Sequence, residues 1–358
     1  MDFLKDFEKS IDKIDGISGS SQPPRYWYSF GNYVLNRVMS GSFMKGVPQG
    51  RITGLAGPSG SGKSFVLGNL VRSAQEAGAY ILLIDSENAF DDGFAQAIGI
   101  DTENNYNYKS VTTIPQVTKI VSSFLKGYRK EYGSDPDAPP VFIGTDSLDM
   151  LMTETELEHY NKGNSKGDQG QRNKQLKAML RTFVQDIKDL NVSMAVTSQV
   201  YRNQDLLNGE GTWIVSDAVR YSLSQIVLLT KLKLKDKDAG AGKFKGIRMK
   251  GMGFKTRFTK PFQDVTIEVP YDEGMDPYSG LLEVCVGMGI AKQAGAWYTN
   301  VGNGQKFQSK DFADYAGDLL VEAEKQTSAI LSIEHDFEED MDEKESAKAR
   351  RKSKAGVE

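Results

Sequence analysis

The chain has 358 residues, of which 39% are hydrophobic and 26% charged, and its formal net charge is −4. This composition is typical of a globular protein with one large core or two modest ones. The slightly acidic balance excludes a basic overall field, so any binding to nucleic acid depends on local basic surface. One cysteine, Cys285, excludes an internal disulfide, and two histidines exclude a zinc cluster or Ser-His catalysis.

No apolar run approaches the roughly 20 residues that span a bilayer, and the first residues lack the basic-then-apolar pattern of a signal peptide. We therefore expect a cytoplasmic protein with no membrane partner. Residues 1–30 are mixed and mostly polar, which predicts an N-terminal arm that docks on a neighbouring subunit.

Residues 51–56 predict a short buried strand, and residues 63–77 have the apolar spacing of a helix. Between them lies a complete G-x-x-x-x-G-K-[ST] phosphate loop, Gly57-Pro58-Ser59-Gly60-Ser61-Gly62-Lys63-Ser64. Loop N–H groups and the N-terminus of the following helix bind the phosphates in such a loop. Lys63 is expected on the β- and γ-phosphates, Ser64 on Mg²⁺, and Phe65 beside them, so ATP and Mg²⁺ are the predicted cofactors.

Strand and helix patterns then alternate along the chain: strands 80–85, 141–146 and 192–198, and helices 91–98, 114–132 and 171–190. This alternation predicts an α/β fold with a mainly parallel central sheet and helices on both faces. Further strands at 225–232, 246–254 and 264–269 would extend that sheet. Residues 31–271 are therefore the predicted core.

Three polar side chains follow the ends of predicted strands. Asp146 ends an apolar strand as a second Mg²⁺ ligand does, acting through water, and Glu87 follows another strand as the candidate catalytic base. Gln199 follows a third strand and could contact the γ-phosphate or the attacking water. A lone carboxylate at such a junction is as often a helix cap, but both together after a phosphate loop favour catalysis.

Two long segments are rich in glycine and carry basic or aromatic residues. The first loop segment (residues 153–171) and the second loop segment (residues 200–217) are predicted to grip a nucleic-acid backbone and meet its bases. Surface loops without that role remain an alternative for each segment alone. The candidate DNA-binding residues in and beside them are Lys162, Lys166, Arg172, Arg202, Trp213 and Arg220.

From residue 272 the pattern changes to a small α/β module (residues 272–332) that ends with a helix near 309–331. Residues 333–358 hold an acidic block followed by a basic one, which predicts a disordered tail. A regulatory role for the acidic block is a hypothesis.

From about residue 28 to 320 the chain resembles the RecA/UvsX family of homologous-recombination proteins, and is most similar to the UvsX recombinases of T-even-type bacteriophages. The phosphate loop and Ile84-Asp-Ser-Glu-Asn-Ala-Phe-Asp91 are shared by many RecA-fold ATPases. More specific are Tyr271-Asp-Glu-Gly-Met-Asp-Pro-Tyr-Ser-Gly-Leu-Leu282 and Lys292-Gln-Ala-Gly-Ala-Trp-Tyr298. The resemblance implies a RecA-type P-loop ATPase core.

The resemblance also implies roles for single residues. Glu87 matches the catalytic glutamate, Asp146 the Walker-B aspartate, and Gln199 the γ-phosphate sensor. Asp91 and Phe94 match adenine contacts, with Phe94 where a tyrosine is common. In the second loop segment, Ser216-Asp217 stands where bacterial RecA has a glycine pair.

Lys255 and Arg257 occupy the positions of two cations that reach the ATP of the neighbouring subunit, and the second is Arg here rather than the Lys of bacterial RecA. The implied function is a DNA-dependent ATPase that forms a filament on single-stranded DNA, pairs it with homologous duplex and exchanges strands. It would serve recombination, DNA repair and recombination-dependent replication, in the host cytoplasm if the chain is phage-encoded. Implied partners are single-stranded and duplex DNA, further copies of the chain, and mediator and single-strand-binding proteins.

Two alternatives stay open. A RecA-fold hexameric helicase shares the phosphate loop, the strand-end Glu and Gln, and a Lys-x-Arg pair such as Lys255-Thr256-Arg257. Such a helicase would carry a primase-binding N-terminal domain, for which we expect no room ahead of residue 57. It would also not account for the recombinase-like residues 271–298. A mediator without turnover is the other alternative, but it would be expected to lack one of the ATP-site residues.

Overall fold

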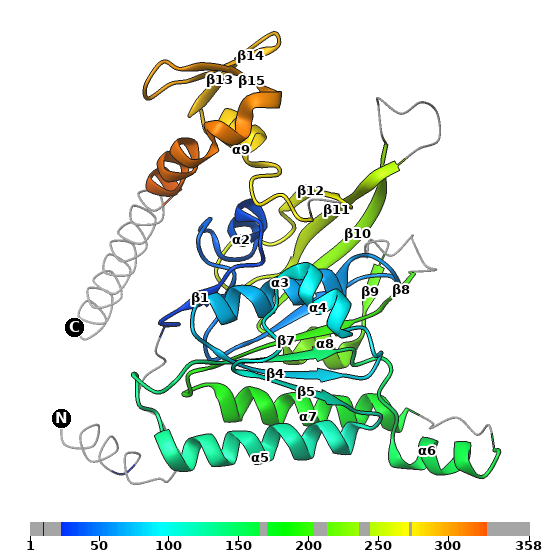
Figure 1. The fold of residues 1–358 in the computed structure, drawn as a ribbon. Helices are drawn as coiled ribbons and strands as arrows, with labels where there is room; N and C mark the ends of the chain where they lie inside the picture. Colours follow the sequence, from blue (N-terminus) through cyan, green and yellow to red (C-terminus); the bar gives the residue numbers. More distant parts are fainter. Residues whose placement is uncertain are drawn as a thin grey trace, which may run out of the picture.

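The structure, a computed structural model, describes residue 10 and residues 23–164, 170–202, 213–235, 244–271 and 274–327. Figure 1 shows a large α/β core and a small C-terminal module beside one end of it. Most of the predicted N-terminal arm, the middle of the second loop segment and the whole predicted tail lie outside the described residues.

An eight-stranded sheet forms the centre of the core, in the order β12-β11-β10-β3-β7-β6-β4-β5. The six strands from β10 to β5 run parallel, and β11 and β12 are antiparallel additions. Their bounds are β3 Ile52–Ala56, β4 Tyr80–Asp85, β5 Tyr106–Ser110, β6 Val141–Asp146, β7 Val192–Ser198, β10 Gln225–Lys235, β11 Phe244–Lys255 and β12 Asp264–Pro270. The predicted α/β class with a mainly parallel sheet is confirmed.

Helices cover both faces of the sheet (Figure 1). One face carries α2 (Tyr33–Ser40), α3 (Lys63–Glu76) and α4 (Asp92–Ile98), and the other carries α5 (Ile114–Tyr132), α7 (Gln171–Ile187) and α8 (Asp217–Ser222). Strands such as β3 and β7 are buried along their whole length because each side faces a helical layer. Two hydrophobic cores result, one per face.

Helix starts follow local chemistry. α5 begins after Thr113, whose hydroxyl accepts the N–H of Gln116 while the Gln116 side chain accepts the N–H of Thr113. The same capping box, Thr153 with Glu156, starts α6 (Glu154–Asn161). We expected the first loop segment to be a loop throughout, but its first half is this capped helix.

The C-terminal module holds α9 (Leu281–Gly287), a three-stranded antiparallel sheet, a 3-10 helix at Ser309–Asp314 and a helix over residues 316–327. The sheet consists of β13 (Ala291–Ala294), β14 (Trp297–Asn300) and β15 (Lys306–Gln308). Glu324 accepts the hydroxyl of Ser42 at 2.6 Å and the N–H of Phe43 at 2.8 Å, which ties the last helix to the core. Over the described ranges, no helix is long and apolar enough to cross a membrane.

Two short ribbons complete the fold. β1 (Trp27–Tyr28) pairs with β2 (Val47–Pro48) next to α2. β8 (Val200–Arg202) pairs with β9 (Trp213–Val215), so the two described ends of the second loop segment form a ribbon. That ribbon lies beside the carboxyl end of β7 (Figure 1), which is the edge of the sheet where ligands of open α/β sheets bind.

Candidate nucleotide-binding site

The phosphate loop connects β3 to α3, which begins at Lys63. Nζ of Lys63 donates to the carbonyl oxygens of Gly57 at 3.0 Å and Pro58 at 3.1 Å. The side chain thus folds over the loop, with its ammonium at the N-terminus of α3, the place where loops of this pattern bind phosphates. Burial lowers the pKa of Lys63, and the nearby carboxylates of Glu87, Asp146 and Asp149 oppose that shift.

The β10–β11 ribbon approaches the phosphate loop closely. A Cβ at Gly57 would collide with the carbonyl oxygen of Leu229, and a Cβ at Gly60 would lie 2.8 Å from Nζ of Lys231. Gly60 also has a φ of +66°, a conformation that glycine adopts without strain. The sequence pattern did not point to Lys231, whose ammonium is a second cation at this loop.

Two buried polar atoms at the site lack hydrogen-bond partners among the described residues: Oγ of Ser61 and Oδ2 of Asp146. A hydroxyl in the loop can donate to a phosphate oxygen, and a free carboxylate oxygen can bind a metal-bound water. No cluster of three metal-ligating side chains occurs within the described ranges. The free oxygen of Asp146 suits Mg²⁺, which keeps most of its waters and is held by one or two protein groups plus phosphates.

Asp146 ends β6 and is 1% exposed. Burial raises the pKa of its carboxyl group, whereas hydrogen bonding with the hydroxyls of Ser64 and Thr197 lowers it. The proximity of Ser64 to Asp146 is the one expected of two groups that share a Mg²⁺ site.

Glu87 lies just past the end of β4 with an exposed side chain. Its Oε1 accepts the hydroxyl of Ser147, which follows Asp146. The fully buried Asp85 shapes this turn, because its carboxylate accepts the N–H groups of Glu87 at 2.9 Å and Phe90 at 3.0 Å. Asp85 is a positioning residue that we did not single out from the sequence.

Gln199 follows β7, in the gap between β7 and β8. Its backbone N–H donates to Oδ2 of Asp149 at 2.6 Å. The structure therefore brings Lys63, Glu87, Asp146 and Gln199 to the carboxyl ends of β3, β4, β6 and β7, which are neighbours in the sheet. Asp149 lies in no motif, so no pattern in the sequence pointed to it.

The two predicted adenine contacts lie at the start of α4. The side chain of Asp91 caps this helix by accepting the N–H of Phe94 at 2.8 Å. The ring of Phe94 is half-buried and meets the ring of Phe90 edge to face, with 5.3 Å between centroids. A role for either residue at adenine stays a prediction.

Lys255 and Arg257 lie at and just past the end of β11. Nζ of Lys255 donates to the carbonyl oxygen of Arg220 at 2.7 Å. Burial lowers the pKa of Lys255, as do the positive charges of Arg257 and Arg220. None of these three cations makes an ion pair with any described residue, so the cluster can accept an anion from outside the protomer.

The structure separates the predicted DNA-binding residues into different settings. Lys162 and Arg202 are exposed, Trp213 is half-buried on β9, and Lys166 lies outside the described residues. Arg172 instead faces inward, where its guanidinium donates to the carbonyl oxygens of Leu148 at 3.1 Å, Leu151 at 2.9 Å and Asp149. Contact of these residues with DNA stays a prediction.

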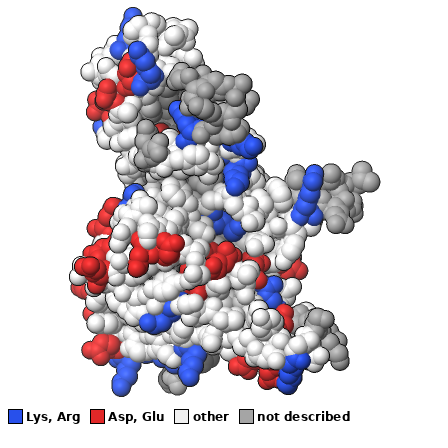
Figure 2. All heavy atoms as spheres, turned by 45° about the vertical axis from the view of Figure 1, so that its right-hand side comes forward, with Lys and Arg blue, Asp and Glu red and all other residues white. Residues whose placement is uncertain are grey.

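The surface charge is uneven. Figure 2 shows acidic side chains in a band across the middle of one face and basic side chains above it, below the C-terminal module. Exposed basic residues of the β10–β11 ribbon are Lys231, Lys233, Lys245, Arg248 and Lys250. Because the net charge is −4, such local surface is what an anionic polymer would meet.

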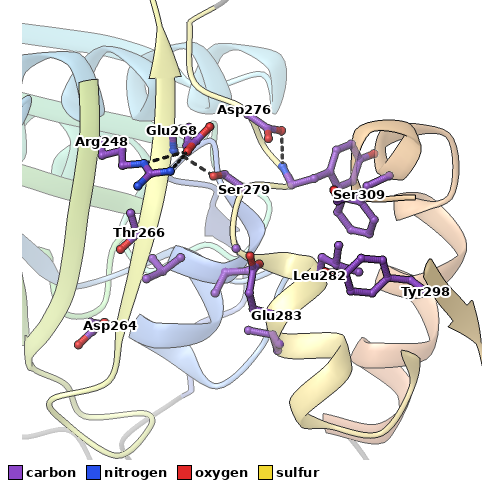
Figure 3. A pocket seen from close by; sticks show the side chains of 16 residues that line it. Arg248, Asp264, Thr266, Glu268, Asp276, Ser279, Leu282, Glu283, Tyr298 and Ser309 are labelled. Atoms are coloured by element: carbon purple, nitrogen blue, oxygen red, sulfur yellow. Dashed lines mark hydrogen bonds and ion pairs between the residues drawn. The ribbon is translucent and has the colours of Figure 1, made fainter. Parts of the chain in front are cut away.

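A cavity of about 870 Å³ lies between β12 and the C-terminal module (Figure 3). Arg248 pairs with Glu268 at 2.7 Å across the sheet, and Oγ of Ser279 accepts the N–H of Glu268 at 2.9 Å. The lining contains none of the predicted nucleotide- or DNA-binding residues. The cavity is thus a seam between core and module, separate from the nucleotide site.

Comparison with known proteins identifies the family. Residues 27–276 match the family model described as the RecA N-terminal domain. Similar proteins include Protein RecA of Clostridioides difficile (strain 630), 26% identical over 304 residues that cover 82% of this chain and 81% of that protein. Protein RecA of Aquifex aeolicus (strain VF5) is 26% identical over 80% of each chain. Protein RecA of Bartonella bacilliformis is 23% identical over 93% of this chain and 95% of its own. This chain belongs to the RecA family.

Proposed function

We propose that the protein is an ATP-dependent DNA strand-exchange recombinase that acts as a filament on single-stranded DNA. The observation that carries this proposal is the convergence of Lys63, Glu87, Asp146 and Gln199 at the ends of four adjacent strands. Lys255 and Arg257, at and just past the end of β11, make no ion pair with any described residue, as expected of cations that act on a neighbouring protomer. Membership of the RecA family supports it.

Hydrolysis of ATP would use these residues in separate roles. Glu87 orients a water and takes its proton as the water oxygen attacks the γ-phosphorus, while the bond from that phosphorus to the bridging oxygen breaks. The hydroxyl of Ser147 fixes the Glu87 carboxylate by donating to Oε1. Lys63 leaves its loop carbonyls to stabilise charge on the β- and γ-phosphates.

Mg²⁺ would be held by Ser64 and, through water, by Asp146. When bound it neutralises charge that develops on the phosphate oxygens. Asp146 must be ionised for this role, and the Ser64 and Thr197 hydroxyls favour the ionised form against the effect of burial.

The cations Lys255 and Arg257 would complete the ATP site of the adjacent protomer. Cations supplied in this way are worth roughly 10³-fold or more in rate. Their lack of an acidic partner within the described protomer supports an anionic partner outside it. ATP would then hold protomers together, and hydrolysis would weaken the interface and release DNA.

DNA would lie along the first and second loop segments, with the exposed cations Lys162 and Arg202 on its backbone and Trp213 against its bases. Base pairing between the bound strand and a duplex would carry sequence recognition. Residues 271–282 and 292–298 support a place among UvsX recombinases of T-even-type phages, with mediator and single-strand-binding proteins as partners.

A hydrolysis assay tests the proposed reaction. We expect ATP turnover that rises at least about tenfold with single-stranded DNA and that is lost in Lys63→Ala, because the variant lacks the phosphate cation. Lys109→Ala, an exposed lysine on β5, is the control and should turn over at the rate of the native protein. Turnover that DNA does not change would contradict the proposal.

A further inference from the structure

The carboxylate of Asp149 contacts residues that flank both loop segments. Oδ2 of Asp149 accepts the N–H of Gln199, which directly precedes the second loop segment, at 2.6 Å. The side chain of Asp149 is only 12% exposed. Its other oxygen lies 3.9 Å from the guanidinium of Arg172, which follows the first loop segment.

Hydrogen bonds of the Arg172 side chain hold the two ends of the first loop segment together. Arg172, in the first turn of α7, donates to the carbonyl oxygens of Leu148, Asp149 and Leu151, which come before the segment. The N–H of Leu148 in turn donates to the carbonyl oxygen of Thr197 on β7 at 3.1 Å. The residues that flank the first loop segment are therefore attached to β7, the strand that Gln199 follows.

We propose that Asp149 is a positioning residue. It transmits a shift of Gln199 at the nucleotide to the residues that flank the first loop segment. This inference rests on the proposed function, in which Gln199 senses the γ-phosphate. A hydrogen bond from an N–H to a carboxylate is short and stronger than a neutral one, so the Gln199 backbone and the Asp149 side chain move together. Arg172 carries that movement to the segment, because it contacts the Asp149 carboxylate and three preceding carbonyl oxygens at once.

This arrangement explains why Arg172 faces inward although it lies beside a predicted DNA-binding segment. A guanidinium with three carbonyl partners and a carboxylate has little capacity left for a DNA phosphate. Its role at this place is to hold the segment in a register that depends on Asp149.

The test combines hydrogen exchange with hydrolysis in the full-length protein. Asp149→Ala removes the acceptor, Asp149→Asn keeps an oxygen acceptor but loses the charge, and Asp137→Ala removes a matched, exposed aspartate between α5 and β6. Amide exchange of residues 199–202 is measured without nucleotide, and the ratio of ATP turnover with and without single-stranded DNA is measured separately.

We expect exchange at residues 199–202 to rise about tenfold or more in Asp149→Ala, the factor that loss of a hydrogen bond to a charged group implies. The DNA stimulation ratio should fall by a similar factor. Asp149→Asn should recover part of both effects, and Asp137→Ala should change neither. Recovery by the amide distinguishes positioning from a general loss of folding.

Unchanged exchange in Asp149→Ala would overturn the inference, and so would faster exchange with an unchanged stimulation ratio. A native protein whose turnover does not respond to DNA would instead overturn the proposed function, and the coupling with it. The exchange measurement still reports in that case whether Asp149 holds Gln199, so the two failures are distinguishable.

Discussion

The ammonium of Lys255 donates to the backbone carbonyl oxygen of Arg220, 2.7 Å away, in α8 just past the second loop segment. α8, which contains Arg220, follows β9 of the second loop segment, so Lys255 is anchored to an element that adjoins this segment. In the proposed function, a DNA strand on segment 200–217 would therefore act on the same element that anchors Lys255.

A mixing experiment tests whether Lys255 and Arg257 act on the neighbouring subunit. Lys63→Ala alone and Lys255→Ala/Arg257→Ala alone should each be inactive in DNA-stimulated hydrolysis. In an equal mixture, about a quarter of the interfaces join an intact phosphate loop to intact cations if protomers assemble at random, so hydrolysis should return to roughly that share of the native rate.

A mixture as inactive as its components would contradict action between subunits. The control is a mixture of Lys63→Ala with Lys109→Ala, whose cations and phosphate loop are both intact. It should hydrolyse ATP at the rate set by its share of native phosphate loops.

Glu87→Gln should leave ATP bound but slow its hydrolysis roughly 10²- to 10⁴-fold, because an amide cannot take the proton of the attacking water. Complexes with single-stranded DNA should then outlast those of the native protein. Single-turnover hydrolysis and DNA dissociation are the measurements. Glu76→Gln, an exposed change at the end of α3, is the control, and a Glu87→Gln rate within about twofold of native would rule out the assigned base.

Arg202→Ala should weaken single-stranded DNA binding and reduce its salt dependence. Each phosphate contact on a single strand contributes about −0.7 to the slope of log K against log salt, so losing one should reduce the slope by about that amount. Fluorescence anisotropy across a salt series measures it, with Lys109→Ala as the control. An unchanged slope would place Arg202 away from the DNA backbone.

Cys285 offers a direct probe of the module. Its thiol is fully buried in α9, and burial raises its pKa to about 11. At pH 8 a disulfide reagent should label the native protein at least about 10²-fold more slowly than the unfolded chain, whose thiol pKa is near 8.5. Rapid labelling of the native protein would show that α9 is not packed as described.

The raised pKa of Cys285 also makes the free energy of unfolding depend on pH. Because the folded thiol stays neutral while the unfolded thiol ionises, stability should fall as pH rises between those two pKa values.

Much of the site could be predicted because its chemistry is local in sequence. The phosphate loop and Glu87 each follow an apolar strand, Asp146 ends one, and parallel strands bring their carboxyl ends to one edge. Asp149 and Lys231 were not predictable in this way. Their contacts with Gln199 and Gly60 depend on which strands are neighbours, and no short-range pattern encodes that.

The missed elements have similar reasons. β5, with the sequence Tyr106-Asn-Tyr-Lys-Ser110, is a short edge strand in which only two tyrosines alternate with polar residues, so the pattern is weak and pairing with β4 completes the strand. α6 has few apolar residues and buries none, but its capping box, Thr153 with Glu156, is visible in the sequence and could have located it.

Pairing of a single strand with supercoiled duplex is the decisive assay for strand exchange. We expect joint molecules that require ATP and sequence homology, and that disappear in Lys63→Ala and in Lys255→Ala/Arg257→Ala. The Lys109→Ala protein should form them as the native protein does. Absence of joint molecules from the native protein, together with DNA-stimulated hydrolysis and duplex unwinding, would rule out a strand-exchange recombinase and indicate a helicase.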